Sequence, residues 1–433
     1  MREVLLRRML RSMLCFPPPS ASRRLPGGRP FHLLLAALAT SSCGDWLYNV
    51  ALVALVYGRT HSGAMVALTT AARVLPIVVL GPLGGVIADR ANRRTLMICS
   101  DLIRAGLMAG LAAVAACDLP ILLAPTLAAV ATVAAIVQPP SVAASTARLV
   151  PAADLQRANA LRSAVGQAAI VAGPALGALV LVVASPAVAI LLNGLTFIAS
   201  AAAVAAIPAG PAFAAPATVE GHVPSVVGDV VTGARALRGA PAAMRLISAD
   251  ILCSGVYGML TVTFVLLSHK LGAGNGGYGL LLGAYGAGGL FGAVVTGRIC
   301  STSRWRSTLA CALLLVAAML VALGTLSNLA EALAASLLVG GGLVVGEVLS
   351  ETAMPLMLDD DVLARAYGLA FPASLGGLVV GSLLAGPLVS LLGLGGALTA
   401  AGLTTLATCG LLTRRPLLTG AGGPSPARQP SPA

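Results

Sequence analysis

The chain has 433 residues, of which 58% are hydrophobic and 10% are charged, and its mean hydropathy is +0.94. Soluble domains carry about 25% charged residues, so this chain cannot cover a water-facing surface and is expected to lie largely in lipid. The formal charge of +12 does not indicate a nucleic-acid partner, because the basic residues lie in short connections and in the tails.

Apolar runs recur along the chain at intervals of roughly 33 residues, and a membrane span needs about 20. They predict an all-α polytopic membrane protein with about twelve transmembrane helices. The two runs at 161–207 are separated only by Ser185 and Pro186, which leaves a count of ten or eleven open. The predicted spans are 31–57, 64–88, 95–117, 119–146, 161–184, 185–207, 245–268, 276–300, 306–328, 329–352, 364–393 and 394–412.

The segments between and outside these spans predict the domain organisation. Residues 1–30 are rich in Arg and Pro and are expected to form a disordered cytoplasmic tail, as are residues 413–433 at the other end. The Pro-rich stretch 208–244 is predicted to be a cytoplasmic linker, with a short surface helix near 225–238. It divides the chain into six-helix halves at 31–207 and 245–412, and two such halves in one chain indicate a pseudo-repeat.

The distribution of basic residues predicts the orientation in the membrane. One set of connections is rich in Arg, whereas the opposite set holds only Arg59 and Lys270. Basic residues collect on the cytoplasmic side, so both termini are expected to be cytoplasmic in a bacterial plasma membrane. The Arg-rich set consists of Arg90, Arg93, Arg94, Arg148, Arg157, Arg235, Arg238, Arg304, Arg306 and Arg365.

The connection after the second span, GVIADRANRR, resembles the signature loop of the major facilitator superfamily, which reads roughly G-x-L-A-D-R-x-G-R-R. The resemblance implies that Asp89 holds the two halves together on the cytoplasmic side. Asn92 replaces a glycine and is expected to keep the bend, since Asn tolerates a left-handed turn. A solvated loop that only sets topology is the alternative. The matching residues are Gly85, Ala88, Asp89, Arg90, Arg93 and Arg94.

The chain is similar to the subfamily that contains the enterobactin exporter and macrolide-efflux proteins, strongly over 31–207 and more loosely over 245–412. The matching pattern is a Gly-Asp in the first span, an Arg-x-Leu-Pro in the second and an Asp-x-x-Arg in the third. The resemblance implies export of a drug, macrolide or siderophore-like molecule. The residues in these positions are Gly44, Asp45, Arg73, Leu75, Pro76, Asp101 and Arg104.

The fifth span resembles the exporter-associated motif G-x-x-x-G-P-x-x-G-G through Gly173, Pro174 and Gly177. Ala169 and Ala178 replace two of its glycines. The motif favours export over uptake, and ordinary packing of small residues is the alternative interpretation.

Charged residues inside spans indicate function, because a charge in the bilayer core costs at least ~2.5–3.5 kcal/mol. At about 1.5 Å per residue, Asp45 lies ~18 Å and Arg73 ~14 Å below the outer surface, so they are expected to pair or to face one cavity. Asn49 shares a helix face with Asp45. Asp101 and Arg104 form a second pair, for which a local ion pair is the alternative. Asp250, Glu347 and Glu351 lie near span ends, where solvation is easier.

Taken together, these features predict a secondary active transporter that exports a small organic molecule by alternating access, with Asp45 as the carboxylate that couples proton entry to export. The rivals are an uptake permease of the same fold and a transport-dead sensor or assembly partner. Its expected partners are the lipid bilayer, the substrate and protons, and the chain is expected to be monomeric. Neither an enzymatic constellation nor a metal or cofactor motif is visible.

Overall fold

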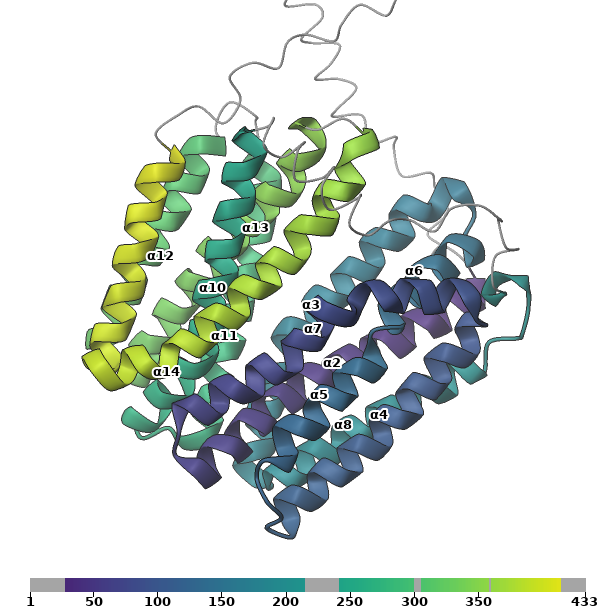
Figure 1. Cartoon of the computed structure of the whole chain (residues 1–433), viewed down its shortest axis with the longest axis horizontal. Helices are drawn as coiled ribbons and strands as arrows, with labels where there is room; N and C mark the ends of the chain where they lie inside the picture. The colour runs from purple at the N-terminus through teal and green to yellow at the C-terminus, as the bar shows by residue number, and fades with distance from the viewer. Residues whose placement is uncertain (1–27, 215–240, 300–304, 358–359, 414–433) are drawn as a thin grey trace, which may run out of the picture.

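The computed structural model describes residues 28–214, 241–299, 305–357 and 360–413, and every regular element in these ranges is a helix (Figure 1). In lipid a backbone must satisfy its polar groups internally, which a helix does within one segment. The first helices are α2 (Gly28–Thr60), α3 (Gly63–Arg90), α4 (Arg93–Ala116), α5 (Leu123–Ala135), α6 (Gln138–Leu149), α7 (Leu155–Val183) and α8 (Pro186–Ala205), with 3-10 turns η1 (Ala152–Asp154) and η2 (Pro211–Phe213). The later helices are α10 (Pro241–Lys270), α11 (Gly274–Ile299), α12 (Trp305–Thr325), α13 (Leu329–Met357) and α14 (Asp360–Thr413).

Ten stretches of the described residues are long and apolar enough to cross a membrane. One of them, Leu369–Leu412 in α14, holds two consecutive crossings, because its backbone leaves the helical region at Gly393 (φ 70°, ψ 170°). Helix α2 is not among the ten, since Asp45 and Asn49 make its middle polar, yet its 33 residues span about 50 Å inside the bundle. With α2 and both parts of α14, the described residues supply the twelve crossings that the sequence predicts, and the fold class is confirmed.

The fourth crossing is two helices rather than the single span predicted at 119–146. Helix α5 ends at Ala135, and Pro139 and Pro140 lie in the first turn of α6. Proline has no N–H to donate to a preceding carbonyl, and two prolines in succession remove two such bonds, which favours the start of a new helix here. The carbonyl of Ile136 lies against Gly84 of α3, where a Cβ would overlap it. The break in one crossing is therefore matched by a glycine in its neighbour.

The two halves contact each other mainly through α7 with α11 and through α3 with α14. Figure 1 shows their helices closest together at the lower left and diverging toward the upper right. We call the closed end of the bundle the one that carries the α2–α3 connection at His61 and Ser62, and the open end the one that carries the α3–α4 connection at Ala91 and Asn92.

Contacts at the closed end are close and mostly between small or apolar residues. The rings of Tyr57 in α2 and His269 in α10 have centroids 4.7 Å apart. A Cβ on Gly63 of α3 would lie 3.4 Å from Val262 of α10. These contacts hold the halves together on this side. Most of the predicted tails and linker, including the predicted helix near 225–238, lie outside the described residues, and the domain boundaries stay a prediction.

Candidate functional site

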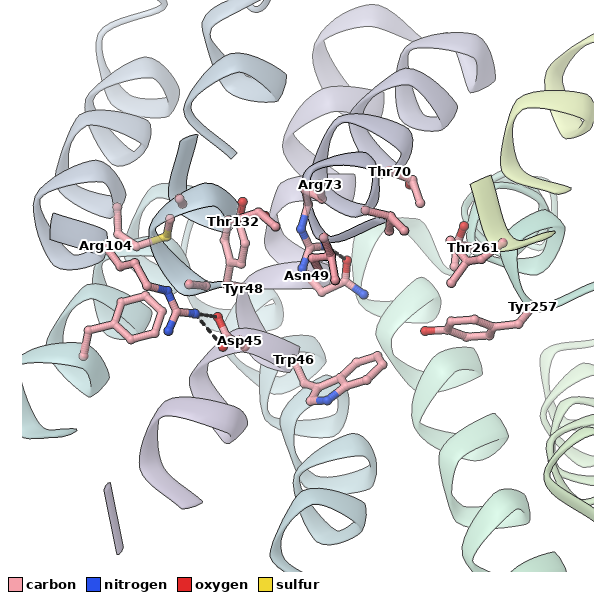
Figure 2. Close-up of a pocket in the computed structure, with 17 residues that line it drawn as sticks. Asp45, Trp46, Tyr48, Asn49, Thr70, Arg73, Arg104, Thr132, Tyr257 and Thr261 are labelled. Carbon is pink, nitrogen blue, oxygen red and sulfur yellow. Dashed lines mark hydrogen bonds and ion pairs between the residues drawn. The ribbon is translucent and has the colours of Figure 1, made fainter. Parts of the chain in front are cut away.

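A cavity of about 280 Å³, the central cavity, lies where α2, α3, α4, α5 and α8 face α10 and α14 (Figure 2). Its walls combine apolar side chains with a small number of charged and hydroxyl groups, which is the composition of a small-molecule site. The polar residues that line it are Asp45, Tyr48, Asn49, Thr70, Arg73, Arg104, Thr132, Tyr257 and Thr261.

Three charged side chains in the N-terminal half form a connected group, the charged triad of Asp45, Arg104 and Asp101. Arg104 Nη2 lies 2.7 Å from both carboxylate oxygens of Asp45, and Arg104 Nη1 lies 3.7 Å from Asp101 Oδ1. The guanidinium of Arg104 lies 3.8 Å from the centroid of the Phe197 ring, so α8 holds it in place. Asp101 is buried and accepts a hydrogen bond of 2.7 Å from Gln138 Nε2. The triad carries one formal negative charge in excess.

Arg73 faces the same cavity but does not pair with Asp45. It donates a hydrogen bond to Asn49 Oδ1, and its guanidinium lies 5.0 Å from the centroid of the Tyr48 ring. Within the described part of the chain no carboxylate forms an ion pair with it. The expectation that Asp45 and Arg73 face one cavity is met, whereas the partner of Asp45 is Arg104. The similar depths of Asp45 and Arg73 in the membrane do not make them partners, because α2 packs mainly against α7 and α8 rather than against α3.

A second cavity of about 290 Å³, the C-terminal cavity, lies beside the first and shares Trp46, Tyr257 and Leu378 with it. Ser374 of α14 donates a hydrogen bond to Asp250 of α10 there. The sequence analysis interpreted Asp250 and Glu347 as residues near solvated helix ends, and the structure instead places both in a cavity wall. The recurrence of Asp250, Ser254 and Tyr257 on one face of α10 is the signal that could have identified this wall.

A third cavity of about 270 Å³ lies on the other side of the Asp45–Arg104 pair, inside the N-terminal half. We call it the N-terminal cavity. Asp45 and Arg104 line both this cavity and the central one, so their ion pair stands between the two. The polar side chains that line it besides this pair are Ser41, Ser42, Gln138, Arg162 and Ser200.

The signature loop lies at the open end. The Asp89 side chain is 68% exposed, and its Oδ1 lies 3.3 Å from Nη2 of Arg93, four residues later in the chain. The ion-pair partner of Asp89 in this structure therefore belongs to the same half. Arg94 donates to the carbonyl of Ala205 at 2.5 Å and ties the loop to the end of α8. The prediction of a left-handed bend at Asn92 is wrong. Its backbone is extended (φ −66°, ψ 113°), and its side chain caps α4 by accepting from the amides of Arg94 and Thr95.

The exporter-type motif of α7 lies between two helices. A Cβ on Gly173 would lie 2.8 Å from the carbonyl of Cys43, and one on Gly177 would lie 3.0 Å from the carbonyl of Leu47, so both glycines bring α7 onto α2. Gly279 of α11, in the other half, lies against the carbonyl of Pro174, and a Cβ on Gly279 would be 3.0 Å from that oxygen. The motif therefore packs inside its own half and also forms part of the interface between halves.

The fold and the cavities between its halves define the class: this is a multi-pass membrane transporter of the major facilitator type. A family model described as transmembrane secretion effector matches residues 28–426. The chain belongs to this family.

Individual relatives agree with this class. A segment of 73 residues, 17% of this chain, is 40% identical to an uncharacterized MFS-type transporter, YfiS, of Bacillus subtilis, and spans 18% of that protein. The nucleoside transporter NupG superposes with a TM-score of 0.68 at 11% identity, over 89% of this chain and 98% of that one. A bacterial homologue of the human lysosomal transporter Spinster, solved in an inward-facing and unoccupied conformation, superposes with a TM-score of 0.64 at 12% identity, over 89% of this chain and 95% of that one. At these identities the solved structures establish the fold alone.

Proposed function

We propose that this transporter exports a small organic molecule of drug, macrolide or siderophore-like type, by alternating access, and that protons move inward in exchange. The observation that carries the proposal is the Asp45–Arg104 pair in the wall of a cavity between the two halves, with Asp101 behind it. Charges at this depth are costly in a bilayer, so they are retained where they act on an ion or a substrate.

The direction of transport is argued from the two ends of the bundle. Arg90, Arg93, Arg94 and Arg148 lie at the open end, and basic residues collect on the cytoplasmic side. In that orientation the halves diverge toward the cytoplasm, the state in which an exporter takes up its substrate and an uptake permease releases one. The partial exporter motif at Gly173, Pro174 and Gly177 and the family description as a secretion effector favour export.

Proton coupling is assigned to Asp45 through its bond to Arg104. Asp45 is 37% exposed at the surface of the cavity, whereas Asp101 is 1% exposed behind it. A proton on Asp45 removes the charge that holds Arg104, which can then pair fully with Asp101 at 3.7 Å. The protonated triad is neutral and the unprotonated triad carries a negative charge. Proton uptake therefore changes the free energy of exposing the triad to either side of the membrane. The N-terminal cavity supplies a polar approach to the pair that does not cross the central cavity.

The interface of α7 with α11 is the part that must separate when the cavity opens to the other side. Gly276, Gly279, Gly283 and Gly286 recur along the face of α11 that meets α7. Small residues let the backbones approach closely and leave few interlocked side chains to pull apart. This interface between α7 and α11, which we call the seam, is suited to repeated opening and closing.

The proposal is tested in two steps. Accumulation of a macrolide, a catecholate siderophore and other small drugs is first compared in cells with and without the gene. Lower accumulation with the gene supports export, whereas higher accumulation would establish the uptake permease. The exported compound is then used in proteoliposomes with an imposed pH gradient.

In that assay Asp45→Asn is expected to abolish gradient-driven export and to leave substrate binding largely intact. If the Asp45–Arg104 pair only fixes helix packing, Asp45→Asn instead lowers stability, and Asp45→Asn combined with Arg104→Gln restores folding and transport together. Full proton-driven export by that double variant would refute the coupling role.

A further inference from the structure

The central and C-terminal cavities have walls of opposite charge. Among the residues that line the central cavity, Asp45 is paired with Arg104, and Arg73 adds a positive charge whose hydrogen-bond partner is the neutral Asn49. Asp101, the third member of the triad, does not line this cavity. No basic residue is among the described residues that line the C-terminal cavity, where Asp250 contributes a carboxylate. A molecule that reaches both cavities therefore meets a cation at one end and the Asp250 carboxylate at the other.

The positive end has a further polar group available for a ligand. The Tyr48 side chain is 4% exposed, lines the central cavity and lies under the Arg73 guanidinium. Its hydroxyl has no hydrogen-bond partner among the described residues. A buried hydroxyl without a partner costs free energy that a bound acceptor would recover. Arg73 and Tyr48 together can thus bind an oxyanion such as a carboxylate.

The negative end is equally defined. The hydrogen bond from Ser374 joins α14 to α10 and fixes the Asp250 carboxylate at the wall. The rings of Tyr257 and Tyr285 line the same cavity and are stacked with centroids 5.1 Å apart. A cavity that holds both a carboxylate and aromatic rings suits an alkylammonium group.

We infer that the transported molecule is amphoteric, with an acidic group that binds Arg73 and a basic amine that binds Asp250. Its apolar or aromatic body would cover Trp46 and Tyr257, which line both cavities; Figure 2 shows their rings on the side of the central cavity away from Arg104. A ligand with only one charge would leave either Arg73 or Asp250 desolvated and without a counter-charge, which selects against it. This inference rests on the proposed transport function and specifies its substrate class.

The test uses a tryptophan that the chain already places at the site. The chain has two tryptophans, of which Trp46 lines both cavities and Trp305 is buried in α12. In the Trp305→Phe variant, quenching of fluorescence therefore reports occupancy beside Trp46. Calorimetry on the unsubstituted protein repeats the measurement in case Trp305→Phe folds poorly.

The probes are aryl compounds that carry both a carboxylate and an amine, each compared with its methyl ester, its N-acetyl derivative and the doubly blocked form. We expect amphoteric members to bind and each blocked form to bind about tenfold to hundredfold more weakly. Arg73→Gln should weaken the parent compound by a similar factor but leave the ester unaffected. Asp250→Asn should weaken the parent but leave the N-acetyl derivative unaffected. Arg306→Gln and Glu331→Gln, which change the same charges at exposed positions outside the cavities, serve as controls.

Three results would overturn the inference. No amphoteric compound binds, or the singly charged or neutral forms bind as tightly as their parents. The third is that Arg73→Gln weakens binding of the methyl ester, or Asp250→Asn weakens binding of the N-acetyl derivative. Proteoliposome transport separates this from the proposed function. Export of a singly charged compound contradicts the amphoteric substrate and leaves export standing. An amphoteric ligand that binds as described but is never moved contradicts export and leaves the assigned site standing.

Discussion

Two neighbouring glycines in α3 lie in different surroundings and give a matched test of the fold. A Cβ on Gly84 would overlap the Ile136 carbonyl, whereas one on Gly85 would meet nothing within 4 Å. Gly84→Ala is expected to destabilise the protein by about 1–3 kcal/mol through overpacking. Gly85→Ala should be neutral or stabilising by up to about 1 kcal/mol, because alanine is the better helix former.

Thermal unfolding in detergent measures both variants. Equal midpoints for the two would contradict the close approach of α3 to the break between α5 and α6. Gly85 also belongs to the signature loop, so transport by Gly85→Ala adds information. A stable variant that transports slowly would indicate that Gly85 is packed in the state with the open end closed.

The charged triad illustrates what single residues in a sequence can and cannot reveal. Asp45, Arg73, Asp101 and Arg104 could be singled out because charges are costly inside apolar runs. Their pairing could not be derived, because it depends on the rotation of each helix about its axis and on which helices are neighbours. Arg104 reaches Asp45 across the face of Phe197, a residue of α8 that no local pattern connects with either of them.

Helix α4 begins at a capping residue whose effect can be measured. Asn92 Oδ1 lies 3.0 Å from the amide of Arg94 and 3.2 Å from that of Thr95. Asn92→Ala should cost about 1 kcal/mol, whereas Asn92→Asp keeps an acceptor at the N-cap and should be close to neutral. The midpoint of thermal unfolding checks this. If Asn92→Asp loses as much stability as Asn92→Ala, the N-cap hydrogen bonds of Asn92 do not account for its contribution to stability.

The seam between α7 and α11 gives a prediction about the balance of conformations. A Cβ on Gly279 would lie 2.6 Å from the Cβ of Ala178 and 3.0 Å from the carbonyl of Pro174. Gly279→Val should therefore disfavour closure at the closed end and shift the population toward the opposite state. Gly410→Val, where a Cβ meets nothing within 4 Å, is the control.

Spin labels at Leu122 and Ser390, both exposed and on opposite halves near the closed end, measure this shift. We expect a longer distance between them in Gly279→Val than in the control. An unchanged distance distribution would remove the seam from the gating mechanism.

At the level of whole helices the sequence is informative because the lipid environment imposes simple rules. Apolar length predicted almost every crossing, and Ser185 and Pro186 did separate α7 from α8. The exceptions are local: Pro139 and Pro140 divide a crossing, and polar residues lower the hydropathy of α2. In each case a residue that breaks the pattern has a structural or functional role that composition averages conceal.

The orientation of the whole molecule is predicted from its basic residues. Reporter fusions at residues 30 and 425 should both give cytoplasmic signals, since the Arg-rich connections lie on the side of the termini. A fusion in the α2–α3 connection is the control and should report the opposite side. A periplasmic signal at one terminus would contradict the twelve-crossing topology, and periplasmic signals at both would place the open end on the periplasmic side.

The turn at Gly393 has a consequence for biogenesis. Leu391 and Leu392 precede it and are 80% and 53% exposed, and the residues after it are again apolar, so no polar loop separates the last two crossings. A straight helix over Leu369–Leu412 would be about 66 Å long, more than twice the thickness of the hydrocarbon core. We therefore expect the insertion machinery to receive these two crossings as one hairpin that enters the bilayer in a single step.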